Sequence, residues 1–106
     1  MRITVTARRI ELPPWAQDLL RSKVEKLERF GHQLVALHAI FGKERYNYTV
    51  EMTLSVKGAT LVGKAKASHD LLTCMEEALW KLKEQLRRRE SKRLELLRRR
   101  AVHRPA

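Results

Sequence analysis

The sequence has 106 residues, which suffices for one compact domain with a modest core but not for a second domain. Its composition, 43% hydrophobic and 33% charged, is typical of a folded protein, and its formal charge of +11 favours phosphate backbones or anionic lipid as partners. No run approaches the roughly 20 apolar residues that span a bilayer, and a single cysteine excludes an internal disulfide. We therefore expect a cytoplasmic protein without a membrane partner.

The first elements expected along the chain are a strand over residues 2–7 and a helix that follows two prolines. Ile3 and Val5 alternate with threonines, as in a strand with one buried face. Pro13 and Pro14 end this strand and suit the start of a helix. The apolar stripe of that helix recurs at spacings of three and four and consists of Ala16, Leu20, Val24 and Leu27, with Leu19 and Phe30 beside it.

Three more strands are expected in the middle of the chain. Residues 34–41 are apolar on both sides, which predicts a strand covered more fully than its neighbours. Residues 46–56 alternate clearly, Lys57 and Gly58 predict a tight turn, and residues 61–67 return as the hairpin partner. The apolar phase of the second of these strands consists of Tyr46, Tyr48, Val50, Met52, Leu54 and Val56.

A second amphipathic helix is expected after Asp70, which makes a good N-cap. At about 100° per residue, Arg89 falls on the same side of this helix as its leucines. The packing surface is therefore expected to end near Leu86, and bare positive charge follows. The apolar stripe consists of Leu72, Met75, Leu79, Leu82 and Leu86, with Leu71 and Ala78 beside it.

The resulting order, β-α-β-β-β-α, predicts an α+β fold. A four-stranded sheet would pack both helices on one face and leave its other face polar and wet. We expect residues 1–92 to form the folded, binding domain and residues 93–106 to form a basic C-terminal tail. Charge density is higher toward the end of the chain, because residues 1–70 contribute +5 and residues 71–106 contribute +6.

No catalytic, cofactor or metal site is expected, and we predict a protein that is not an enzyme and has no small-molecule substrate. The four histidines lack zinc-like spacing, and Cys74 has no second cysteine beside it. Its place at the edge of the stripe predicts a small, semi-buried thiol. Glu76 and Glu77 fall on different sides of the helix, which excludes a converging carboxylate pair.

Basic residues on both helices predict a surface that binds RNA phosphates. Lys23 projects from within the first apolar stripe, and Lys83 lies on one flank of the second helix. Two such helices side by side would form a basic groove. Trp80 lies away from the stripe, where it either stacks on a base or covers a neighbouring loop, the second being favoured. The candidate binding residues are Lys23, Lys26, Arg29, Lys81, Lys83, Arg87, Arg88, Arg89, Lys92 and Arg93.

Three segments resemble the bacterial ribosome hibernation-promoting factors, a family that includes the ribosome-associated inhibitor protein Y. They are residues 1–12 (MRITVTARRIEL), 23–30 (KVEKLERF) and 70–86 (DLLTCMEEALWKLKEQL). The resemblance covers residues 1–92 and implies the same element order. It is to the short members of the family, which lack the C-terminal domain of the long members. The family's basic helix positions carry over to Lys23, Lys26, Lys81, Arg88 and Lys92.

The resemblance implies a translation inhibitor that binds the small ribosomal subunit at the decoding region, where messenger and transfer RNAs sit, in starved or stationary cells. Its partner would be ribosomal RNA, and we expect a monomer off the ribosome. Two alternatives remain open. One is a general double-stranded RNA-binding module. The other is a protein-interaction domain whose tail forms a coiled coil through Leu94 and Leu97.

Overall fold

The computed structural model describes residues 1–30, 33–67 and 70–102. Its elements follow the order expected from the sequence, with a short 3₁₀ helix (η1) after the first helix. The α+β prediction is therefore confirmed. The elements are β1 (Arg2–Arg8), α1 (Pro14–Leu27), η1 (Glu28–Phe30), β2 (Leu34–Glu44), β3 (Asn47–Val56), β4 (Ala59–Ala67) and α2 (Leu71–Val102).

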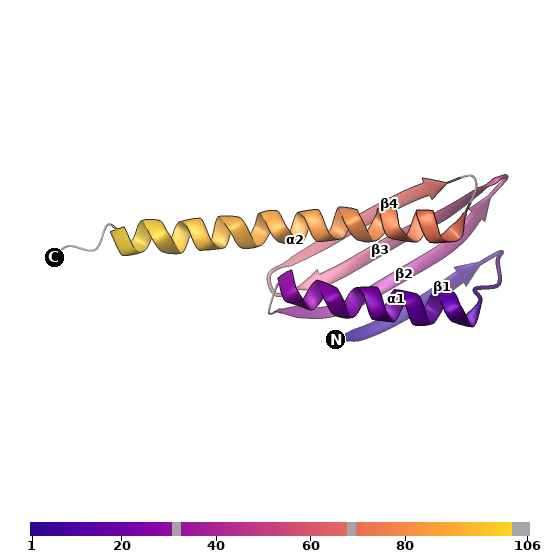
Figure 1. The fold of residues 1–106 in the computed structure, drawn as a ribbon, viewed down its shortest axis with the longest axis horizontal. Helices are drawn as coiled ribbons and strands as arrows, with labels where there is room; N and C mark the ends of the chain where they lie inside the picture. The colour runs from indigo at the N-terminus through magenta and orange to yellow at the C-terminus, as the bar shows by residue number, and fades with distance from the viewer. Residues whose placement is uncertain (31–32, 68–69, 103–106) are drawn as a thin grey trace.

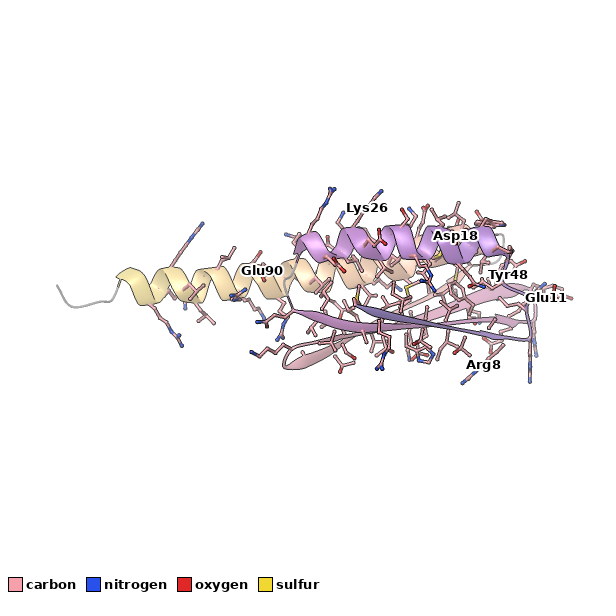
Figure 2. The ribbon with its side chains drawn as sticks, turned by 90° about the horizontal axis from the view of Figure 1, so that it is seen from below. Arg8, Glu11, Asp18, Lys26, Tyr48 and Glu90 are labelled. Carbon is pink, nitrogen blue, oxygen red and sulfur yellow. The ribbon has the colours of Figure 1, made fainter. Side chains whose placement is uncertain are left out.

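The four strands form one mixed sheet in the order β1-β2-β3-β4. Strand β1 pairs parallel with β2, and the other two pairs are antiparallel. Both helices cover the same face of this sheet, with α2 over β3 and β4 and α1 beside it (Figure 1). The opposite face carries side chains such as Arg8 and is left open (Figure 2).

The core lies between the sheet and the two helices. The stripe predicted for α2 faces it, since Met75 and Leu82 are fully buried and Leu86 is 3% exposed. Burial of such apolar side chains stabilises the fold by about 25 cal/mol per Å². The largest fully buried side chains around them are Phe41, Leu20, Leu37, Met52 and Leu54.

Strand β2 differs from its expectation, because it is covered less fully than its neighbour β3. Val35 and His38 of β2 are exposed, whereas every side chain of β3 is buried or half-buried. Its register with β3 shifts between Leu34 and Ala36, so Val35 is the extra residue and its side chain is 58% exposed. Such a bulge changes which residues face the helices. The prediction of a strand covered more fully than its neighbours is wrong, and the buried side chains of β2 are Leu37, Ala39 and Phe41.

Two turns join β2, β3 and β4. Tyr46 lies in the first turn with its side chain 85% exposed, so its predicted place on the buried face of β3 is wrong. Tyr48 is half-buried, and the Lys43 Nζ atom lies 5.4 Å from the centroid of its ring. The second turn is the predicted one, at Lys57 and Gly58, where glycine adopts a φ of 84°.

Side chains of α2 cover the edge strand β4. Lys81 Nζ donates a hydrogen bond to the carbonyl oxygen of Lys64, and Gln85 Nε2 donates one of 2.8 Å to that of Val62. Carbonyl groups along a free strand edge invite pairing with another chain. These contacts protect that edge and fasten α2 to it.

Helix α2 starts at a capped end, as the sequence predicted. Asp70 Oδ1 accepts a hydrogen bond of 2.7 Å from the amide of Leu72, and Oδ2 accepts one of 2.8 Å from the Thr73 hydroxyl. The bond from Thr73, followed by that from Leu72, lowers the pKa of the Asp70 carboxyl below its usual value. The cap therefore favours a charged aspartate at neutral pH.

One turn further on, the Cys74 side chain is fully buried, deeper than the semi-buried position expected of it. Its Sγ lies 3.4 Å from the carbonyl oxygens of both Tyr48 and Ala65. Burial raises the pKa of the thiol, which favours the unreactive neutral form.

Helix α2 continues far beyond the sheet. Its 32 residues span about 48 Å at 1.5 Å per residue. After Leu86, the side chains of residues 87–100 are exposed, apart from half-buried Glu90. The packing surface thus ends where the sequence predicted, whereas the chain remains helical through residue 92 to Val102 (Figure 1).

Candidate nucleic-acid interface

A groove lies between α1 and α2, and we call it the interhelical groove. Its volume is about 280 Å³. Leu27 and Leu79, both buried, form its floor. Lys26 lies on the surface of α1 that faces away from the sheet (Figure 2). The remaining lining residues are Lys23, Lys26, Glu76, Trp80 and Lys83, so the structure brings together three of the predicted cations.

Lys23 lines this groove because it lies next to the buried stripe of α1. Its Nζ is 3.6 Å from Oε1 of Glu76 on α2, and the two side chains are 32% and 52% exposed. A pair this exposed contributes little to stability. It does hold the ammonium group at the groove wall, as expected for a lysine within an apolar stripe.

Arg87 follows Lys83 one turn later on the same flank of α2. Its Nη2 lies 3.1 Å from Oε2 of Glu84. Hydrogen bonding from Arg87 lowers the pKa of the Glu84 carboxyl, and the same bond raises the pKa of the guanidinium. Arg87 therefore stays charged, and any other anion that contacted it would have to compete with Glu84.

Trp80 borders the groove with a side chain that is 60% exposed. This exposure does not fit the favoured expectation that the indole covers a neighbouring loop. It leaves the ring accessible, as the stacking alternative requires.

Other predicted binding residues lie outside the groove. Lys81 faces the opposite flank, where its Nζ bonds to β4 and lies 3.8 Å from Oε1 of Glu77. Glu76 and Glu77 therefore do point to different sides, as predicted. Arg29 is exposed on η1, and Arg88 is exposed on α2.

Three further predicted cations surround a second hollow, which we call the α2 hollow. It lies beside the point where α2 leaves the sheet and measures about 500 Å³. The Nη2 atom of Arg89 donates a hydrogen bond of 2.9 Å to the carbonyl oxygen of Lys57. Arg93 Nη1 lies 3.4 Å from Oε1 of Glu90. The lining includes Leu34, Val56, Leu86, Arg89, Lys92 and Arg93.

Residues 3–94 match the family model described as "Sigma 54 modulation protein / S30EA ribosomal protein". The chain belongs to this family. It is 26% identical over 95 residues to a ribosome hibernation promoting factor of Azotobacter vinelandii, covering 90% of this chain and 88% of that protein. The resemblance noted from the three sequence segments is thereby confirmed.

Two solved structures have the same fold as this S30EA family member. A ribosomal subunit interface protein from Coxiella burnetii superposes with a TM-score of 0.76 at 21% identity, over 86% of this chain and 99% of the other. The N-terminal domain of Thermus thermophilus Protein Y gives a TM-score of 0.76 at 18% identity, over 83% and 98%.

Two acidic residues of this S30EA family member were missed as parts of the site. Glu76 meets Lys23 only through the packing of α1 on α2, and no sequence pattern links the two positions. The pair of Glu84 with Arg87 has the i, i+3 spacing of helical ion pairs, so sequence reasoning could have found it.

Metal-binding groups do not gather in the described part of this S30EA family member. Within residues 1–30, 33–67 and 70–102, no three His, Cys, Asp or Glu side chains come together to hold an ion. His38 instead meets Thr6, whose Oγ1 lies 2.9 Å from Nε2 of the imidazole. Across the same described ranges, every helix is too short or too polar to cross a membrane.

Proposed function

We propose that this chain is a ribosome hibernation factor that binds the small ribosomal subunit at its decoding region. There it would exclude messenger and transfer RNA and so inhibit translation. The observation that carries this proposal is the interhelical groove, which gathers Lys23, Lys26 and Lys83 on a fold shared with ribosome-associated proteins.

The groove suits RNA because its cations stand on two rigid helices. Phosphate contacts from lysine and arginine position a protein on RNA without reading its sequence. Trp80 adds an exposed aromatic ring at the rim, where stacking on an unpaired base supplements these contacts. Inhibition of this kind requires only that the site be occupied, so the role involves no chemical step on a substrate.

The decisive experiment removes the same amount of positive charge from two different faces of the protein. One variant replaces the groove-side cations Lys23, Lys26, Lys83 and Arg87 with glutamine. Its matched control replaces four cations of the sheet strands, Arg2, Arg8, Lys64 and Lys66, all of which are exposed. Both variants lower the net charge by the same amount. Sedimentation with purified small subunits then measures binding.

The groove variant is expected to lose sedimentation with small subunits, whereas the sheet variant keeps it. Equal loss in both would show that net charge alone drives binding and would sink the proposed site. A competition with naked duplex RNA addresses the alternative of a general double-stranded RNA-binding module. Strong displacement from the subunit by duplex RNA would favour that alternative.

A further inference from the structure

We propose that the α2 hollow is a docking site for an acidic amphipathic helix of a partner protein. The hollow is lined by different residues from the interhelical groove. The inference therefore does not rest on the interhelical groove, and it gives Arg89, Lys92 and Arg93 a role other than the RNA binding expected from the sequence. It rests on two properties that occur together, an apolar strip and a basic rim.

The apolar strip has two parts, one at the edge of the core and one on the projecting part of α2, and Arg89, Glu90 and Arg93 lie between them on this side of the helix. Val56 and Leu86 are 8% and 3% exposed at its inner end, and Leu97 is 50% exposed at its outer end. Leu86 and Leu97 are separated by about three helical turns, or roughly 16 Å, so they share one side of α2. A strip of this length fits about three turns of another helix that presents apolar residues at spacings of three and four.

The rim of the hollow is basic and selects the charge of the occupant. Residues 87–100 contain eight lysine or arginine residues and two glutamates. The hollow is bordered by five cations and one carboxylate, namely Lys57, Arg89, Lys92, Arg93 and Arg100 against Glu90. A second copy of this chain would present the same positive surface, and like charges facing each other oppose association. An acidic segment meets the rim with complementary charge.

The apolar strip also distinguishes a protein occupant from RNA. Phosphates are bound by the cations alone and gain nothing from Leu96, which is 58% exposed beside them. Nucleobases bind through stacking on aromatic rings, and the lining of the hollow consists of aliphatic and polar side chains. Leucines together with arginines match a helix that carries both apolar and carboxylate groups.

The test uses the full chain and a defined probe. The probe is a fluorescein-labelled peptide of about 16 residues, roughly 24 Å as a helix, with leucine at helical positions i, i+3, i+4 and i+7 and glutamate elsewhere. Fluorescence anisotropy measures its affinity. The first variant combines Leu96→Ser with Leu97→Ser. Its control is Leu94→Ser, at a leucine that is 49% exposed on the same helix but does not line the hollow.

A second pair of variants tests the rim. Arg93→Gln with Arg100→Gln removes two rim charges, and Arg98→Gln with Arg99→Gln removes two charges outside the lining. Both hollow variants are expected to weaken peptide binding by about tenfold or more. Both controls are expected to stay within about twofold of the unmodified chain. Circular dichroism verifies that each variant keeps its helix content.

Several results would overturn the proposal. Equal binding of a scrambled peptide of the same composition would show attraction by charge alone. If Leu94→Ser weakened peptide binding as much as the Leu96→Ser and Leu97→Ser variant, the hollow would not be the binding site. Loss of binding to an oligouridylate RNA on replacing Leu96 and Leu97 would assign the surface to RNA. Self-association that disappears in the same variant, measured by sedimentation, would assign it to a second copy.

Discussion

The backbone of Gly63 on β4 and that of Ala78 on α2 lie in direct contact. A Cβ atom built at residue 63 would stand 2.5 Å from the carbonyl oxygen of Ala78 and 3.2 Å from Cγ of Leu82. Glycine is thus the residue that lets α2 sit close to the edge of the sheet.

We expect Gly63→Ala to destabilise the fold, because the new methyl group meets backbone rather than a movable side chain. Overpacking of this kind costs about 1–3 kcal/mol. Urea denaturation measures the change. The control is Val62→Ala, at the neighbouring residue, whose side chain is 40% exposed. A change below about 0.5 kcal/mol for Gly63→Ala would contradict the close contact.

Replacing the helix cap should make stability less sensitive to acid. Asp70→Ala is expected to lower the melting temperature at neutral pH, since the amide of Leu72 loses its acceptor. The pKa of Asp70 is lower in the folded protein than its ordinary value of 3.8. The stabilisation that Asp70 provides is therefore complete above its ordinary pKa. It is lost as the pH falls through the lower pKa that Asp70 has in the folded protein.

Thermal denaturation at a series of pH values measures this effect. The difference in melting temperature between the unmodified protein and Asp70→Ala should shrink below the ordinary aspartate pKa. Asp70→Asn serves as a control, because its amide oxygen still caps the helix but does not titrate. A gap that stays constant with pH would show that the charge of Asp70 plays no part in the cap.

The Cys74 thiol should react slowly in the folded protein. It is fully buried, and its raised pKa reduces the amount of reactive thiolate. We expect iodoacetamide to modify it at least about a hundredfold more slowly than in the urea-unfolded chain. The control is Ser91→Cys in a Cys74→Ala background, which places a thiol at an exposed site of α2. Similar rates at the two positions would contradict the burial of Cys74.

Arg89 should restrain the start of the projecting part of α2. Its bond to the Lys57 carbonyl joins α2 to the turn between β3 and β4. Arg89→Ala is expected to speed amide hydrogen exchange around residues 57–58 and 87–92 and to cost about 1 kcal/mol. Arg88→Ala, at the adjacent exposed residue, is the control. Unchanged exchange in Arg89→Ala would rule out such a restraint.

Binding to the small subunit should depend strongly on salt. If about six phosphates are contacted, affinity should fall on the order of a thousandfold between about 50 and about 200 mM salt. Equilibrium binding at several salt concentrations gives the slope. The groove variant proposed above should show a shallower slope than the sheet variant. A slope near zero would contradict phosphate contacts as the main source of affinity.

Most of the fold followed from periodicity, because alternation and helical spacing report which side of an element is buried. Strand β3 and the packed half of α2 were predicted in this way, and Leu86 marked the end of packing. Strand β2 was misjudged in part because a bulge between Leu34 and Ala36 leaves Val35 exposed. A bulge depends on how a strand pairs with its neighbour, and the strand's own residues do not reveal it.

The positions of the candidate binding residues were predictable only in part. A lysine within an apolar stripe, Lys23, correctly pointed to the space between the helices. Lys81 was predicted to bind RNA together with Lys23, although its side chain bonds to a carbonyl of β4. Arg89 was predicted to be free charge, although it donates a hydrogen bond to the Lys57 carbonyl. Both partners are backbone carbonyls far away in the sequence. Contacts of that kind follow from tertiary packing, so residue type and spacing do not predict them.

The uninterrupted course of α2 has a mechanical consequence. Its first half is fixed to the sheet at Lys81 and Gln85, and its second half is part of the same helix through Val102. The interhelical groove and the α2 hollow therefore keep a constant spacing and orientation. Two partners bound to them at once would be held at a set distance, with α2 as the rigid spacer between them.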